Sequence, residues 1–294
     1  MPASHPLVDP VLEWFSGHAR DLPWRRPGTS PWAVLVSEVM LQQTPVSRVL
    51  PAYLDWLDRW PQPADLAADQ PAEAVRSWGR LGYPRRALRL HACAVAIVEE
   101  HGGRVPDELA ALLALPGVGD YTARAVLAFA YRRRAAVVDV NVRRVLARAV
   151  TGQGQPGLPA TARDLAAMEP LLPAQHTTAA RFSAALMELG ALVCTAGQPD
   201  CGRCPVREQC AWRLAGCPPY AGPVPRPQRF AGTDRQVRGL LMAVLRASPG
   251  PVPQGSLDLA WPDVRQRQRA QDWLIADGLI DPLPDGRFAL PSRS

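Results

Sequence analysis

Apolar side chains recur every three or four residues almost continuously up to residue 220, and no other feature constrains the fold as strongly. Between residues 46 and 57, for example, Val46, Val49, Tyr53 and Leu57 fall on one face of a helix. No segment before residue 220 alternates apolar and polar side chains with the two-residue period of a strand. The sequence therefore predicts an all-α fold for this part of the chain.

Capping residues and prolines help to place the ends of the expected helices. Thr44 and Pro45 have the pattern of the N-cap and the first-turn proline of a helix. Pro51 is expected to kink that helix, and Gln42 then lies at a tight junction between two helices. The expected helices cover residues 10–20, 32–41, 46–57, 65–81, 85–101, 107–113, 122–131, 141–150, 160–171 and 178–193.

The last part of the chain has a different pattern. Prolines are frequent in residues 218–233, which predicts a linker. Residues 234–294 follow, introduced by a capping box at Thr233–Gln236. They contain three helical segments and a plausible hairpin turn at Pro284–Gly286. Three helices followed by a hairpin predict a winged-helix-like domain.

The charge balance favours a polyanionic partner. The chain has 33 basic and 27 acidic residues and a formal net charge of +6, although many basic proteins bind nothing charged. In the C-terminal domain, Arg265, Arg267 and Arg269 are candidates for contact with such a partner, with a solvated basic face as the alternative. Every basic residue is an arginine, so no side-chain amine is available for Schiff-base chemistry.

Targeting signals are not evident. No apolar run approaches the roughly 20 residues that a membrane-spanning helix needs, and the N-terminus has no secretory pattern. Six cysteines in 294 residues are too few for a disulfide scaffold. We therefore expect a cytoplasmic protein whose cysteines are thiols or metal ligands.

Four of the cysteines form the strongest motif, Cys194-x6-Cys201-x2-Cys204-x5-Cys210. Thiolates this close in sequence can close around one metal centre. Zinc is the general alternative, but zinc sites usually contain two C-x2-C pairs, whereas here one pair is flanked by single cysteines. The spacing favours an iron–sulfur cubane held by one loop.

A second motif, Leu115-Pro-Gly-Val-Gly119, precedes an expected helix and has the pattern of a helix–hairpin–helix. Gly117 and Gly119 can adopt positive φ and leave the backbone bare. The N–H groups at the start of the next helix can then hold a DNA phosphate. An ordinary connection between two helices is the alternative.

Two carboxyl groups occupy informative positions. Asp139 precedes the helix expected at 141–150, where it is either an N-cap or an active-site carboxylate. Glu38 lies in the string Ser-Glu-Val-Met-Leu-Gln-Gln-Thr on an otherwise apolar helix. It is either solvated there or a buried acid whose pKa is raised toward neutrality.

Together and in this order, the motifs resemble those of the MutY-type adenine DNA glycosylases, which are helix–hairpin–helix enzymes with a 4Fe-4S cluster. The similarity covers residues 8–217 and includes the segments 22–25, 81–83 and 187–191. It implies a two-lobed, all-α glycosylase fold with a cluster loop. The implied parts are a six-helix lobe at 29–137, a cluster lobe at 1–28 and 138–217, the linker at 218–233 and the winged-helix-like domain at 234–294.

The resemblance also implies a reaction, hydrolysis of the N-glycosidic bond of adenine mispaired with 8-oxoguanine or guanine in double-stranded DNA. Glu38 would protonate adenine N7, and Asp139 would stabilise the sugar cation. Tyr121 would support that carboxylate; related lyases have lysine there, which implies base release without strand cleavage. The remaining implied site residues are Arg20, Trp24, Arg25 and Leu41 at the adenine, Gln42 and Tyr83 as wedges in the duplex, Gly117 and Gly119 at the DNA backbone, and Cys194, Cys201, Cys204 and Cys210 on the cluster.

Two of the departures from the family pattern concern recognition of the bases. Ala184 stands where the family often has Glu or Gln, so one contact to adenine is expected to be missing. Residues 234–294 do not resemble the NUDIX-like domain that reads 8-oxoguanine in longer members.

Two other functions stay open. One is a thymine–guanine mismatch glycosylase on the same scaffold, which the Met-Leu-Gln-Gln-Thr string beside Glu38 disfavours. The other is a non-catalytic iron–sulfur DNA-binding protein, which the pair of carboxylates disfavours. In each case we expect a bacterial monomer that associates with the nucleoid and not with a membrane.

Overall fold

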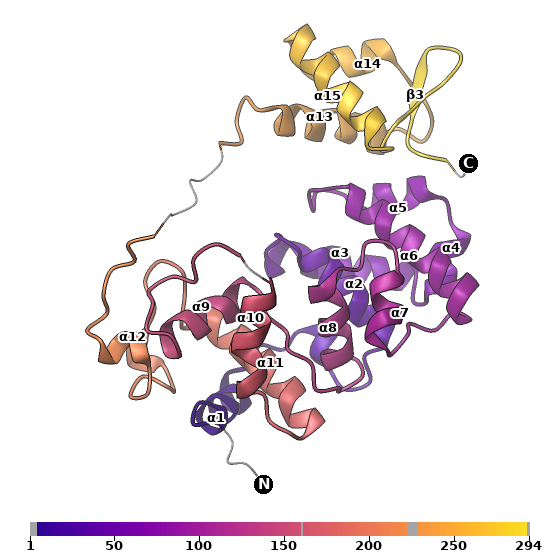
Figure 1. Ribbon diagram of the computed structural model, residues 1–294. Coiled ribbons are helices and arrows are strands. Elements are labelled where there is room, and N and C mark those ends of the chain that lie inside the picture. Colours follow the sequence, from indigo (N-terminus) through magenta and orange to yellow (C-terminus); the bar gives the residue numbers. More distant parts are fainter. Residues whose placement is uncertain (1–4, 160, 223–228, 293–294) are drawn as a thin grey trace. The chain divides into compact units, whose positions relative to one another are not determined.

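The computed structural model describes residues 5–159, 161–222 and 229–292, which are mostly helical (Figure 1). This confirms the all-α fold class. The chain divides into two compact units, one of residues 1–34, 107–113 and 119–225 and one of residues 35–106, 114–118 and 226–294. The lobe boundaries drawn from the sequence do not coincide with this division and stay a prediction. No helix in the described ranges has the length and apolarity that a bilayer span requires.

The first unit has an apolar core to which helices from distant parts of the sequence contribute. Its central helix α11 packs against α1, α8 and α9, and Phe182 and Leu186 of α11 are at most 1% exposed. A Cβ atom on Gly190 would lie 2.7 Å from the Cβ of Asn141, so only glycine allows α11 and α9 to approach this closely. The elements are α1 (Val8–His18), η1 (Pro23–Arg25), α8 (Asp120–Phe129), α9 (Val140–Ala149), α10 (Thr161–Met168), η2 (Glu169–Leu171), α11 (His176–Leu192), η3 (Cys201–Arg203) and α12 (Ala211–Leu214).

The second unit contains a cluster of buried tryptophans. The ring of Trp56 lies edge-on to those of Trp60 and Trp78, with centroids 4.6 and 5.7 Å away, and all three side chains are at most 2% exposed. Helices α4 and α5 pack on α6 beside this cluster. The helices here are α3 (Val46–Arg59), α4 (Pro63–Ala68), α5 (Pro71–Trp78) and α6 (Arg85–His101), while α2 (Pro31–Leu41) and α7 (Leu109–Ala114) each cross the boundary between the units.

The prediction of one helix over residues 65–81 is wrong, because two helices, α4 and α5, occupy this range. Pro71 is the first residue of α5, where its missing N–H costs nothing. The Asp69 carboxylate accepts a hydrogen bond from the Gln70 N–H at 2.8 Å, which stabilises the break between the helices.

Thr44 is not an N-cap. The helix begins at Val46, with Pro45 in the cap position and no side-chain cap. The Thr44 hydroxyl instead donates to the Leu81 carbonyl at 3.2 Å, in a different loop. A long-range contact has therefore replaced the local one that the sequence suggested.

The C-terminal domain has the expected winged-helix-like composition of three helices and a small sheet. The sheet is antiparallel in the order β1-β3-β2, with Val252 opposite Phe288. Thr233 caps the first helix by accepting from the Gln236 N–H. The elements are α13 (Asp234–Ala247), β1 (Val252–Pro253), α14 (Gln254–Asp258), α15 (Val264–Ala276), β2 (Asp281–Pro282) and β3 (Arg287–Ala289).

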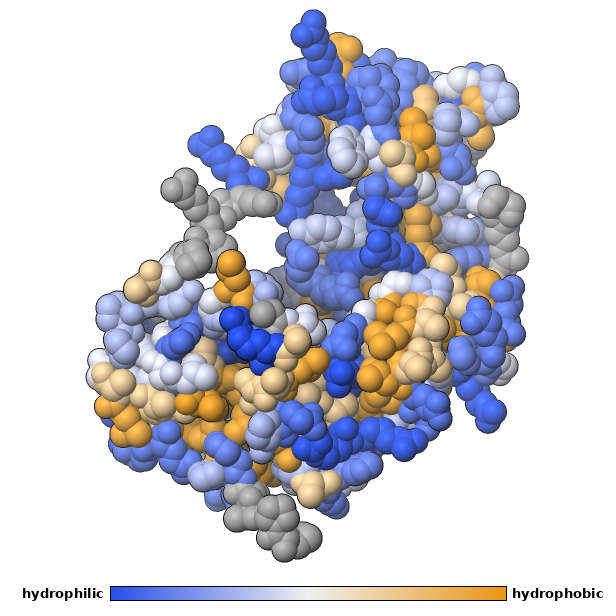
Figure 2. All heavy atoms as spheres, in the orientation of Figure 1, coloured by the Kyte–Doolittle hydropathy of each residue, from blue (hydrophilic) through white to orange (hydrophobic). Residues whose placement is uncertain are grey.

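Hydrophilic residues cover much of the visible surface of this domain, at the top of Figure 2. Of its three candidate DNA-binding arginines, Arg267 is 9% exposed and pairs with Asp258 at 2.9 Å. Arg267 is therefore a buried side chain that forms an ion pair within the domain, which corrects the expectation that it contacts DNA. Arg269 forms an exposed pair with Asp234, so it stays a candidate beside Arg265.

Candidate active site and cluster site

The four cysteines of the predicted cluster motif line one cavity of the first unit. Cys194 follows the end of α11, Cys201 begins η3 and Cys210 lies directly before α12. All four are free thiols. Among the described residues, no three ligating side chains converge closely enough to hold a single metal ion. Four thiols around a shared cavity are the donor set that an iron–sulfur cluster needs.

Basic groups and burial set the electrostatics of this cavity. Arg148 Nη1 donates to Cys194 Sγ at 3.4 Å, and Arg207 and Arg213 also line the cavity. Burial, together with the neighbouring thiols, raises the pKa of Cys204 to about 11. Without a bound cation the Cys204 thiol would therefore stay protonated at neutral pH, whereas a metal cluster favours the thiolate form.

Asp139 is the N-cap of α9, and its two carboxylate oxygens have different partners. Oδ1 accepts from the Val142 N–H at 2.7 Å, and Oδ2 accepts from Asn141 Nδ2 at 2.8 Å. Burial raises the pKa of Asp139, while these two hydrogen bonds oppose the shift. The residue therefore has the N-cap geometry that the sequence suggested, at a partly buried position.

A relay of polar side chains connects Asp139 to the cysteine loop. Asn141 Oδ1 accepts from Arg144 Nη2 at 2.7 Å. The same guanidinium donates through Nε to the Cys194 carbonyl at 2.6 Å and through Nη2 to the Gly190 carbonyl at 2.6 Å. We call Asp139, Asn141, Arg144 and Cys194 the relay; it is a direct covalent and hydrogen-bonded path from the candidate carboxylate to a candidate cluster ligand.

Glu38 and Tyr121 lie on α2 and α8, in the second and the first unit respectively. Glu38 is 5% exposed on a helix whose neighbouring residues Val39 and Met40 are also buried. Tyr121 is partly buried in the first turn of α8. The structure thus buries the Glu38 carboxyl group, and burial favours the protonated form of an acid.

The hairpin motif joins α7 to α8. Gly117 has φ +77°, and a Cβ there would lie 2.7 Å from the Cβ of Arg89, so glycine is required. Gly119 is the N-cap of α8 and has extended backbone, which does not require glycine. Both glycines are exposed while Leu115 and Val118 are buried. The loop is therefore anchored by apolar side chains and presents bare backbone to solvent.

Arg20 and Arg25, expected at the adenine, are held by a carboxylate that the sequence analysis did not select. Glu188 is fully buried. It accepts from Arg20 Nε at 2.7 Å and Nη2 at 2.8 Å, and from Arg25 Nη1 at 2.9 Å. Although burial acts in the opposite direction, these contacts lower the pKa of Glu188. The only feature of the sequence that could have indicated this role is that Glu188 is an acidic residue within the largely apolar helix expected at 178–193.

We expect Glu188→Gln to destabilise the protein by about 2–4 kcal/mol, because two partly buried guanidinium groups lose their anionic partner. Urea unfolding monitored by circular dichroism measures this effect. The matched control is Glu208→Gln, since Glu208 forms a solvent-exposed pair with Arg207 and such pairs contribute little to stability. Equal midpoints for the two variants would contradict the assignment.

The two predicted wedge residues lie on loops that a single buried arginine connects. Arg86 Nη1 donates to the carbonyls of Gln42 (2.7 Å) and Val39 (2.7 Å), and Nη2 donates to the carbonyl of Gly82 (3.0 Å). Burial lowers the pKa of Arg86 to about 10, so the group stays charged at neutral pH. The loops that carry Gln42 and Tyr83 are therefore held as one piece.

Backbone conformation singles out two residues of these loops. Gln43 and Tyr83 have φ +54° and +49°, in the left-handed region that residues other than glycine rarely adopt. Both are exposed, whereas Gln42 and Leu41 are partly buried, and Trp24 is 7% exposed in η1. Gln43 is thus a second candidate beside Gln42, and its left-handed conformation could not be read from the sequence.

Comparison with known proteins agrees with these motifs. Residues 36–169 match the family of HhH-GPD superfamily base excision DNA repair proteins. The chain is 56% identical to adenine DNA glycosylase of Mycobacterium tuberculosis over 284 residues, covering 96% of this chain and 93% of the relative. It is 57% identical to adenine DNA glycosylase of Mycolicibacterium smegmatis over 287 residues, covering 96% of each.

A comparison of structures gives the same fold. The structure of a thermostable thymine-DNA glycosylase matches with a TM-score of 0.63 at 29% identity, over 71% of this chain and 95% of that one. The sequence identity to the mycobacterial relatives is much higher and extends through the C-terminal domain. The chain therefore belongs to the adenine DNA glycosylase family within the HhH-GPD superfamily, and it is a DNA N-glycosylase of base excision repair.

Proposed function

We propose that the enzyme hydrolyses the N-glycosidic bond of adenine mispaired with 8-oxoguanine or guanine in double-stranded DNA and leaves the strand intact. The identity of 56% over nearly the whole chain to an adenine DNA glycosylase carries this proposal. A buried acid at Glu38 and a hydrogen-bonded carboxylate at Asp139 support it. We further propose that the enzyme acts as a monomer in the bacterial cytoplasm.

Each carboxyl group performs one half of the reaction. Glu38 protonates adenine N7, because adenine leaves easily only as a neutral base. Asp139 stays ionised and stabilises the positive charge that develops on the sugar. Tyr121 faces the sugar and supports that carboxylate. Burial of Glu38 favours its protonated form, whereas the N–H donors around Asp139 favour its carboxylate and oppose the effect of burial on its pKa.

The flipped adenine is held by Trp24, Leu41 and the N–H groups of Arg20 and Arg25 that Glu188 leaves available. Gln42 or Gln43 and Tyr83 occupy the gap in the duplex, which offsets the cost of unstacking the base. Gly117 and Gly119 hold the backbone through their N–H groups. Arg265 and Arg269 are the remaining candidates for phosphate contacts in the C-terminal domain.

The test of this function is a panel of duplexes that differ only in the mispair, with the released base identified. Adenine released opposite 8-oxoguanine or guanine, and no thymine released opposite guanine, is the expected result. The similarity to a thymine-DNA glycosylase makes thymine release the second candidate.

Borohydride should trap no protein–DNA adduct, since the chain contains no lysine. A robust adduct would contradict base release by water.

We propose that Cys194, Cys201, Cys204 and Cys210 bind a 4Fe-4S cluster, which would fix the loop between α11 and α12. Purified protein is expected to contain iron and to absorb near ~400 nm. Cys204→Ser should lose most of the iron, whereas Cys217→Ser should keep it, because Cys217 is exposed and outside the cavity. Stoichiometric zinc without iron would rule the cluster out.

A further inference from the structure

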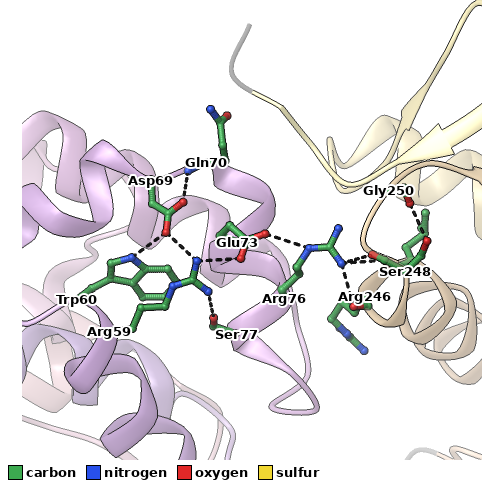
Figure 3. Close-up of polar contacts among 11 residues, drawn as sticks. Arg59, Trp60, Asp69, Gln70, Glu73, Arg76, Ser77, Arg246, Ser248 and Gly250 are labelled. Carbon is green, nitrogen blue, oxygen red and sulfur yellow. Dashed lines mark hydrogen bonds and ion pairs between the residues drawn. The ribbon is translucent and has the colours of Figure 1, made fainter.

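The C-terminal domain is attached to α5 of the same unit by one arginine. Arg76 Nη1 donates to the carbonyls of Arg246 at 3.0 Å and Leu245 at 3.4 Å, and to that of Ser248 (Figure 3). Carbonyls in the last turn of a helix have no partner within the helix and form the negative end of its dipole. Arg76 therefore caps the C-terminal end of α13 with a positive charge from outside the domain.

Arg76 is itself held in place by a chain of ion pairs. Its Nε donates to Glu73 at 3.1 Å, and Glu73 also accepts from Arg59 Nη2 at 2.9 Å. The same Nη2 donates to Asp69 at 2.9 Å, to which the Trp60 indole N–H also donates. Figure 3 shows these side chains in sequence from α3 to α13. The contact between Arg76 and α13 is therefore connected through ion pairs to Trp60 of the tryptophan cluster. It does not depend on one flexible side chain.

Two more contacts lie on the neighbouring stretch 83–85. Arg85 Nη1 pairs with Asp277, directly after α15, at 3.0 Å. The Arg235 guanidinium carbon lies 4.7 Å from the centre of the Tyr83 ring. Arg235 is in the first turn of α13 and Arg76 binds its last turn, so α13 is held at both ends.

Tyr83 depends on such contacts for a defined orientation. It is 43% exposed, and its backbone lies in the left-handed region that non-glycine residues rarely adopt. The guanidinium carbon of Arg86 also lies near the ring, 5.7 Å from its centre. Arg86 belongs to the buried anchor, whereas Arg235 comes from the C-terminal domain. The domain thus contributes one of the two cations beside the ring.

We propose that Arg235 is a positioning residue for Tyr83, and that Arg76 keeps it in place by docking the C-terminal domain. The C-terminal domain thereby affects how the enzyme distinguishes 8-oxoguanine from guanine opposite the adenine. This role rests on the proposed function, in which Tyr83 enters the duplex beside that base. An arginine beside an aromatic ring is attracted to the face of the ring, and losing this attraction is enough to change a discrimination ratio measurably.

The experiment measures single-turnover adenine release by the full chain from two duplexes, with 8-oxoguanine or guanine opposite the adenine. We expect Arg235→Ala to reduce the ratio of the rate with 8-oxoguanine to the rate with guanine about three- to tenfold. Arg235→Lys should keep part of the wild-type ratio, since the lysine ammonium can also make a cation–π contact with the ring. The matched control is Arg238→Ala, which removes the same charge from the same helix at a site beside Asp234.

Arg76→Ala should give the same loss, and the Arg76→Ala/Arg235→Ala double variant should lose no more than the larger single effect. Hydrogen–deuterium exchange provides a readout that is independent of activity. Exchange at residues 243–250 should accelerate in Arg76→Ala and stay unchanged in Arg235→Ala. Fully additive effects, or unchanged exchange in Arg76→Ala, would contradict docking through Arg76.

The outcomes separate this inference from the function on which it rests. If the wild-type chain releases no adenine from either duplex, the proposed function fails. If the wild type prefers the 8-oxoguanine duplex and Arg235→Ala keeps that preference, only the role of Arg235 fails. If Arg238→Ala reduces the ratio as much as Arg235→Ala, the effect is one of charge on DNA binding and the positioning role is wrong.

Discussion

Glu38→Gln is expected to slow single-turnover release of adenine by at least ~10²-fold, the lower end of the range for acid catalysis. Glutamine has nearly the same shape and removes only the proton that the leaving base needs. Glu38 is 5% exposed, so the variant loses no solvent contact that could disturb folding. Quenched-flow or manual-quench assays with enzyme in excess of DNA measure the rate directly.

Asp139→Asn should cause a loss of similar size for a different reason, because the sugar cation then has no anion beside it. An asparagine at this position still has one oxygen that can accept from the Val142 N–H, so the cap of α9 is kept. Binding of a duplex that contains a non-cleavable adenine analogue should change little in either variant. Near wild-type rates in Glu38→Gln or in Asp139→Asn would contradict the corresponding assignment.

Arg86→Ala should destabilise the second unit by about 3–5 kcal/mol. The change removes a buried charged side chain together with the hydrogen bonds that it donates to the carbonyls of Val39, Gln42 and Gly82. Chemical unfolding followed by tryptophan fluorescence suits the measurement, because Trp78 lies beside the Arg86 guanidinium. Arg86→Lys should recover only part of the loss, since an ammonium cannot span both loops.

The adjacent arginine provides the control. Arg85 forms a half-exposed pair with Asp277, so Arg85→Ala should cost no more than about 1 kcal/mol. A similar destabilisation by Arg85→Ala and Arg86→Ala would mean that burial of the Arg86 guanidinium contributes little.

The fold class and the cysteine site could be predicted from the sequence, because both depend on local spacing. Helical periodicity needs only neighbouring residues, and the thiols that line the cavity all come from one short segment. The same holds for Asp139, which is followed directly by its own helix. At each of these positions the residues that interact are close in the sequence.

The missed features all involve partners that are far apart in the sequence. Glu188 and Arg20 are separated by 168 positions, and nothing near Glu188 indicates that two arginines neutralise it. Arg86 looked like any other arginine of a basic chain until the structure placed carbonyls from two loops around it. Thr44 was assigned to the nearest helix for the same reason, because its partner, Leu81, cannot be seen locally.

The relay from Asp139 through Asn141 and Arg144 to the Cys194 carbonyl affects how preparations of the enzyme should be compared. When the proposed cluster is bound, it fixes Cys194 and, through this path, the Asp139 carboxylate that we propose to face the sugar. We expect molecules that lose their iron during purification to be inactive. A measurement of total protein concentration still includes these molecules. The burst amplitude should follow iron content across preparations while the rate constant stays the same, so activities are best normalised to iron.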